Sequence, residues 1–265
     1  MQKTSIQVAL LLFFLNVTFS ASQPKLASAS NKEQIKLGIN TGLSTDGLVG
    51  LNENQKVQIL KLLDSAKIHV TSIEGKKWNR RRQSYLAIGS DSLKSQDNYQ
   101  FHLFAFELSG PKIRLMAISD GPYTLGKRET LVGFDFAAYQ INPHEYAFGI
   151  RYSRVRSYAA GGESSLEGIL LYRIEGKAFQ GILNMTTSFE SELAGEWNED
   201  GTRDRSGNSG HAVIIVTKHK TDGYFDWIKK ADDGKSAPLI WDGSSYAMQG
   251  EDPFPIHELD IFESE

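Results

Sequence analysis

The sequence predicts a mainly all-β protein with one N-terminal helix. From Ile68 onward, apolar residues recur with period 2, in short stretches rich in aromatic and β-branched residues. Gly, Pro, Asn, Asp and Ser bound these stretches, as is typical of strands joined by tight turns. No strand pattern alternates with long amphipathic helices, which disfavours doubly wound α/β folds. We therefore expect an antiparallel meander, with its clearest strands at residues 99–108, 112–119, 132–141, 145–153, 168–174 and 211–217.

Three predicted hairpins have the same pattern around a glycine. Gly110, Gly176 and Gly243 are separated by 66 and 67 residues, and each has apolar residues two and four positions before it and three positions after it. This spacing indicates an internal repeat of about three propeller-blade-like, four-stranded units within residues 68–250. The alternative is an ordinary meander whose hairpins look alike because all hairpins have similar requirements.

Three blades alone would leave faces and edges exposed, since closed propellers usually have more. The N-terminal helix could cover one end, the units could form an open twisted assembly, or two chains could close a ring. A homodimer is therefore one expectation.

One segment carries a family resemblance. The stretch TDGYFDWIKK, residues 221–230, resembles the core of FG-GAP or VCBS-type propeller repeats at Asp222, Gly223 and Asp226. The resemblance implies an Asp-Gly turn that leads into an inner strand. Such repeats often hold calcium through acidic residues before the glycine, but here the run is KHKT, residues 218–221. Because calcium needs several oxygen ligands, we expect no calcium site.

Residues 1–22 have the plan of a secretory signal peptide. Lys3 precedes an apolar run from Val8 to Leu15, and small residues place cleavage after Ser20 or Ser22. The alternative, a membrane anchor, would need a longer apolar run than the one that Asn16 interrupts. The chain has no cysteine, which for an exported protein favours a bacterial periplasm or exterior.

Residues 23–67 are predicted to be a mobile lead-in followed by an amphipathic helix. Asn52 and Gln55 form a capping-box pattern, and apolar residues then recur at helical spacing through Leu60 and Leu63. We interpret this helix as a cover for the sheet structure, with a partner-binding helix as the alternative.

Composition and motifs exclude several functions. A net charge of -3 gives no reason to expect nucleic-acid binding. The six histidines are scattered without metal-ligand spacing, and no nucleotide-binding or hydrolase motif occurs, so we predict no metal, no cofactor and no catalytic residues.

Two polar segments are candidate binding loops. In residues 75–82, GKKWNRRR, five cations surround Trp78, and the guanidinium groups of Arg80, Arg81 and Arg82 are suited to grip phosphate, sulfate or carboxylate groups. The alternative for this segment is a solvated turn whose charges keep a sheet edge soluble.

The second candidate segment, residues 195–211, is predicted to be the longest polar connector. It carries Trp197, Arg203 and Arg205, and long loops on rigid β-scaffolds often perform recognition. Its alternative is a flexible linker with the Trp packed back onto the sheet. Residues 251–265 are predicted to be a frayed acidic tail.

These observations favour an exported, non-enzymatic binding protein that presents loops on a β-repeat scaffold to a protein or an anionic envelope polymer. An inhibitor or immunity-type role belongs to the same class. The alternative is an envelope-saccharide hydrolase with an unrecognised carboxylate pair.

Overall fold

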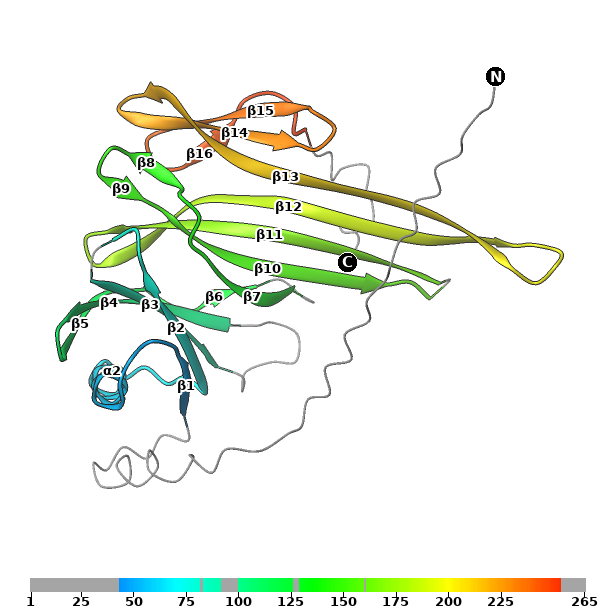
Figure 1. The fold of residues 1–265 in the computed structure, drawn as a ribbon. Helices are drawn as coiled ribbons and strands as arrows, with labels where there is room; N and C mark the ends of the chain where they lie inside the picture. The colour runs from blue at the N-terminus through cyan, green and yellow to red at the C-terminus, as the bar shows by residue number, and fades with distance from the viewer. Residues whose placement is uncertain (1–42, 82, 92–99, 126–128, 160, 254–265) are drawn as a thin grey trace, which may run out of the picture. The chain divides into compact units, whose positions relative to one another are not determined.

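The computed structural model describes residues 43–81, 83–91, 100–125, 129–159 and 161–253 (Figure 1). All of them belong to one compact unit, residues 41–265. The predicted signal peptide, the lead-in at residues 23–36, Arg82 and residues 254–265 of the predicted acidic tail lie outside the described residues. The described chain is mainly β, with one helix, which confirms the predicted fold class at this level.

The helix, α2, covers Glu53–Ser65, and the predicted capping box between Asn52 and Gln55 is present. It packs against the hairpin at Gly110. Gln55 Nε2 donates to the Gly110 carbonyl at 3.1 Å, and Gln58 Nε2 donates to the Pro111 carbonyl at 2.8 Å. The helix therefore packs against the sheet structure, as we expect for a helix that covers it.

The first sheet has six strands. They are β1 (Ser44–Leu48), β2 (Ser72–Trp78), β3 (Ser84–Asp91), β4 (Gln100–Ser109), β5 (Lys112–Ile118) and β6 (Tyr123–Thr124). Strands β1 to β5 are adjacent in chain order, and β6 pairs with β4. The β1–β2 pair is parallel and the other pairs are antiparallel. Strand β1 was not predicted from the sequence, because its five residues carry few apolar side chains.

The second sheet has eight strands. They are β7 (Glu129–Asp135), β10 (Phe148–Ser157), β11 (Gly162–Glu175), β12 (Ala178–Trp197), β13 (Arg203–Thr221), β14 (Tyr224–Ala231), β15 (Ser236–Trp241) and β16 (Tyr246–Met248). The order runs from β16 through β10 to β7, and all pairs are antiparallel. A separate two-stranded hairpin contains β8 (Gln140–Asn142) and β9 (Glu145–Tyr146). The predicted strand at 132–141 is therefore divided between β7 and β8.

Two hydrophobic cores hold these sheets. The first joins the two large sheets through residues such as Ile88, Phe101 and Leu103 on one side and Phe148 and Tyr172 on the other. The second lies on the opposite face of the eight-stranded sheet and includes residues of the β8–β9 hairpin. Its members include Ile141, Ile169, Ile182, Trp227, Leu239 and Trp241.

The predicted turn glycines are in turns, but the structure does not show three separate four-stranded units. Gly110, Gly176 and Gly243 have φ angles of 60°, 61° and 105°, which L side chains rarely adopt. Gly110 joins β4 to β5 in the six-stranded sheet, whereas Gly176 and Gly243 both join strands of the eight-stranded sheet. Neither sheet is closed. The shared pattern corresponds to the common needs of hairpins, and the blade count is not confirmed.

The predicted polar connector at 195–211 is wrong, because most of it is strand. Residues 195–197 end β12 and residues 203–211 begin β13, so only a five-residue turn at 198–202 connects them. These strand ends form a two-stranded ribbon that extends beyond the neighbouring strands (Figure 1). Both of its faces are largely exposed, so its sequence lacks the apolar alternation that reveals other strands.

The start of the predicted acidic tail is held in place by a buried cation. Lys229, on β14, is fully buried, and its Nζ donates to both carboxylate oxygens of Asp252 at 2.7 and 3.0 Å. The frayed tail that the sequence predicts therefore does not begin at residue 251.

Candidate functional site

Among the described residues, two surface cavities of about 340 and 420 Å³ are each large enough for a small ligand. The one of about 420 Å³ contains part of the predicted cationic segment, and we call it the arginine cavity. Three parts of the chain contribute to it: the β2–β3 turn, the β8–β9 hairpin and β11. The lining residues are Trp78, Arg80, Arg81, Asn142, His144, Glu145, Tyr146 and Ile174.

Backbone hydrogen bonds fix the turn that presents the two arginines. The Arg81 amide donates to the Trp78 carbonyl at 3.3 Å, and the Ser84 amide donates to the Arg81 carbonyl at 3.2 Å. Trp78 pairs with Ser84 where β2 and β3 meet the turn. Arg80 and Arg81 are therefore held at the end of the hairpin, where both are exposed.

Trp78 is a core residue rather than an exposed loop aromatic, which corrects the sequence-based view of this segment. Its side chain is 2% exposed and packs edge-on against Phe148, with ring centroids 5.4 Å apart. Trp78 belongs to the core between the large sheets with Leu86 and Ile88 of β3, although the buried residues earlier in β2, Ile73 and Gly75, lie on the other face of that strand. Its indole N–H is buried and has no hydrogen-bond partner among the described residues.

The β8–β9 hairpin supplies the facing wall. Asn142 Oδ1 accepts a hydrogen bond from the His144 amide at 3.0 Å, and Asn142 Nδ2 donates to Glu145 at 2.9 Å. The guanidinium of Arg80 lies over the Tyr146 ring, 5.9 Å from its centroid. This is a cation–π arrangement, which holds the charge beside the cavity.

Charge in the arginine cavity is unbalanced. Its one carboxylate, Glu145, forms an ion pair with Arg173 at 3.1 Å, so its negative charge already has a cationic partner. Among the described residues, no carboxylate forms an ion pair with Arg80 or Arg81. The cavity thus presents two guanidinium groups to an incoming group, together with the polar side chains of Asn142, His144 and Tyr146.

The second predicted cluster lies at the end of the β12–β13 ribbon and does not reach this cavity. Trp197 is 70% exposed, and the Arg203 guanidinium stacks on its ring at 5.0 Å from the centroid. Arg203 Nε also donates to the Gly195 carbonyl at 2.9 Å, and Arg205 pairs with Glu192. These arginines have partners within the ribbon, so they are less available to an external anion.

The charge of the ribbon end also makes it less suited to an anionic ligand than the arginine cavity. From residue 190 to residue 205 it carries six carboxylates against two arginines. Its carboxylates are Glu190, Glu192, Glu196, Glu199, Asp200 and Asp204. An anionic ligand is therefore suited to the arginine cavity, whereas the ribbon offers an exposed aromatic in acidic surroundings.

The sequence alone does not indicate that several of these residues line the arginine cavity. Asn142, His144, Glu145 and Tyr146 lie far from Arg80 along the chain, and a tertiary contact brings them together. The one available signal was the polar, turn-forming stretch INPHEY at residues 141–146, which interrupts the strand pattern.

Other features of the described residues bear on chemistry. In the described part of the chain, no group of three or more His, Asp or Glu side chains is arranged to hold a metal ion. The one described helix is too short and too polar to span a membrane. Comparison of the chain with protein-family models, curated proteins and solved structures found no match.

Proposed function

We propose that the protein is an exported, non-enzymatic binding protein, and that the arginine cavity holds an anionic group of its ligand. The main support for this proposal is that Arg80 and Arg81 form no ion pair among the described residues. Both guanidinium groups are exposed at a cavity and have no carboxylate partner in the described part of the chain.

The ligand group is a phosphate, sulfate or carboxylate, presented by an envelope polymer or by a partner protein. A guanidinium donates through a planar fork that matches these oxygens, and such charge-assisted bonds are stronger than neutral ones. A solvated turn, the alternative for this segment, would not need the facing wall that Asn142, His144 and Tyr146 provide.

Saccharide hydrolysis has less support than binding. The usual mechanism needs two carboxyl groups that flank the scissile bond, and the arginine cavity has only Glu145. Asp226 is the one buried carboxylate residue among the described ones, and its partner is His219 rather than a second carboxylate.

Calorimetric titration of the protein with pyrophosphate tests the proposal. Replacing Arg80 and Arg81 together by Gln should weaken binding at least about tenfold, because each charge-assisted hydrogen bond contributes roughly 1.5 to 3 kcal/mol. The matched control, Arg114→Gln with Lys230→Gln, removes the same charge from exposed positions outside the cavity and should retain binding. Equal losses in both double variants would show a general charge effect and contradict the proposal.

A further inference from the structure

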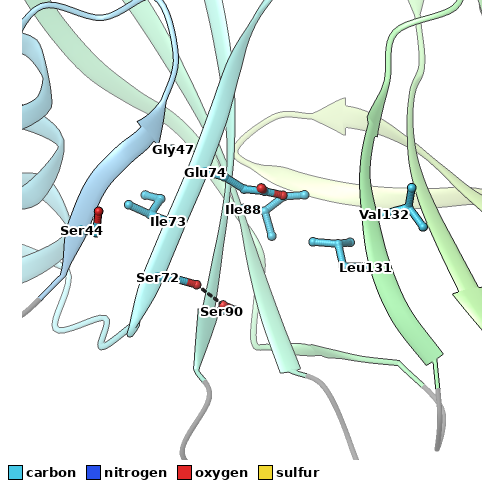
Figure 2. Close-up of a pocket in the computed structure, with 9 residues that line it drawn as sticks. All are labelled: Ser44, Gly47, Ser72, Ile73, Glu74, Ile88, Ser90, Leu131 and Val132. Carbon is cyan, nitrogen blue, oxygen red and sulfur yellow. Dashed lines mark hydrogen bonds between the residues drawn. The ribbon is translucent and has the colours of Figure 1, made fainter. Parts of the chain in front are cut away.

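The cavity of about 340 Å³ lies between the two large sheets, at β1, β2 and β3 on one side and β7 on the other (Figure 2). We call it the Glu74 cavity. Strand β7 ends the eight-stranded sheet and does not pair with the six-stranded sheet, so the cavity occupies the unclosed seam between them. The residues used below are Ser72, Glu74, Ile88, Ser90, Leu131 and Val132.

Strand register places Glu74 on the inner face of the six-stranded sheet. Glu74 lies opposite Ile88, and Ser72 lies opposite Ser90, in the antiparallel β2–β3 pair. Directly opposite residues project from the same face of a sheet. Ile88 is 1% exposed and belongs to the core between the sheets, so Glu74, which is itself exposed, lies beside the edge of that core.

The Glu74 carboxylate has no cationic partner in the described part of the chain. The residue is accessible from solvent, yet the cavity walls remove enough water from its side chain to raise the pKa of the carboxyl above its ordinary value. A carboxylate in such a place is stabilised when a cation enters beside it.

The rest of the cavity combines an apolar wall with hydroxyl groups. Figure 2 shows the side chains of Glu74, Ile88 and Leu131 in the space between β3 and β7. Leu131 also packs against the core between the sheets, whereas Val132, the next residue of β7, lies on the other side of the strand (Figure 2) and is 56% exposed. Ser72 and Ser90 are hydrogen-bonded to each other, which leaves each hydroxyl oxygen able to accept a further bond.

We propose that the Glu74 cavity binds a small organic amine. The ammonium group lies against the Glu74 carboxylate and donates to the serine hydroxyls, and a short apolar body packs on Ile88 and Leu131. This site has the opposite charge preference from the arginine cavity and involves different strands, so it does not depend on the function proposed above.

Two probes of the same shape test the role of charge. We expect 2-phenylethylamine to bind the protein about tenfold more tightly than the neutral 2-phenylethanol in calorimetric titrations, since only the amine forms a charge-assisted bond. Chemical-shift changes at the backbone amides of residues 72–75 and 131–132 should accompany binding. Equal affinity for amine and alcohol, or no binding of either, would overturn the proposal.

Variants distinguish the contribution of the carboxylate to binding from that of the apolar wall. Glu74→Gln keeps the size of the side chain and should remove the preference for the amine, while Glu53→Gln, at an exposed helical carboxylate, should leave it unchanged. Leu131→Ala, which shortens the apolar side chain of β7 that faces Glu74, should weaken both probes by a similar factor. A Glu74→Gln protein that unfolds at the wild-type temperature and still prefers the amine would overturn the assignment.

Discussion

Tyr152 lies on β10 with its ring buried in the core between the large sheets, and its hydroxyl donates to Asn184 Oδ1 at 3.0 Å. Burial raises the pKa of Tyr152 to about 12, and the nearby charge of Glu129 adds to the effect. Burial is also the first cause of a raised pKa at five other described tyrosines. They are Tyr85, Tyr123, Tyr139, Tyr172 and Tyr246. Above about pH 10 the folded protein therefore keeps protons that the unfolded chain releases.

The sign of the pH effect follows from this difference. Because the folded state binds more protons than the unfolded state above about pH 10, the free energy of unfolding should fall as pH rises from there toward 12. Urea unfolding at a series of pH values measures this slope. Tyr152→Phe removes one of the responsible groups and should give a shallower slope, so an unchanged slope in this variant would contradict the assignment.

Single residues also show how far the sequence predicts the site. The cations at positions 80 and 81 were recognisable because charge and planar guanidinium geometry are properties of the residue itself. The burial of Trp78 was not recognisable, since it depends on the face of β2 that packs on Phe148. Glu74 was missed for a related reason: the sequence does not show that β7 lies opposite β2 and β3.

At the scale of elements, strands with one buried face were predictable and polar strands were not. The stretches at 99–108 and 168–174 lie within or nearly within β4 and β11, where apolar alternation is strong. The ribbon at the end of β12 and β13 is stabilised by cross-strand pairs such as Arg205 with Glu192 and by backbone bonds, which leave no hydrophobic period.

Hairpin turns provide a test of the shared glycine pattern. Gly176 has a φ of 61°, and a Cβ added there would meet no atom within 4 Å, so the cost of a side chain is purely conformational. Gly176→Ala should lower the free energy of unfolding by about 1 kcal/mol. Gly121→Ala is a matched control, because this glycine has equal space and no positive φ. Equal stability of the two variants in urea unfolding would contradict this reasoning.

The ribbon makes a separate prediction for recognition. Trp197 is exposed and contributes little to either core, so Trp197→Ala should change the free energy of unfolding by less than about 0.5 kcal/mol. If the ribbon contacts a protein partner, the same variant should lose that partner in affinity capture followed by mass spectrometry. Arg114→Gln, which changes an exposed residue of β5, should retain it. Retention of every partner by Trp197→Ala would contradict a binding role for this aromatic.

For the whole molecule, the prediction of a β-protein was correct because periodicity is local, whereas the arrangement of strands in sheets depends on distant contacts. Strand β13 illustrates this point: its first part pairs with β12, and its second part, from Ala212, pairs with β14. One strand thus connects the projecting ribbon to the C-terminal strands, which no separate repeat unit would do. The predicted homodimer stays a hypothesis that light scattering tests, and a single-chain mass at high concentration would contradict it.

If the protein is exported, removal of the signal peptide should lower the mass of the chain by a defined amount. Cleavage of the predicted signal peptide after Ser20 or Ser22 would give a protein that begins at Ala21 or Gln23. Intact-mass measurement of protein recovered from outside the cytoplasm should find one of these two masses. Recovery of only the uncleaved chain, bound to the membrane, would favour the anchor alternative.

The ion pair between Lys229 and Asp252 has a practical consequence for shortened versions of the protein. Burial lowers the pKa of Lys229, and Asp252 acts in the opposite direction by stabilising its charge. A protein that ends at residue 250, just after the last strand, would enclose this ammonium without its carboxylate, and removing one member of a buried pair is strongly destabilising. Expression boundaries, fusion junctions and proteolytic trimming should therefore be placed beyond Asp252.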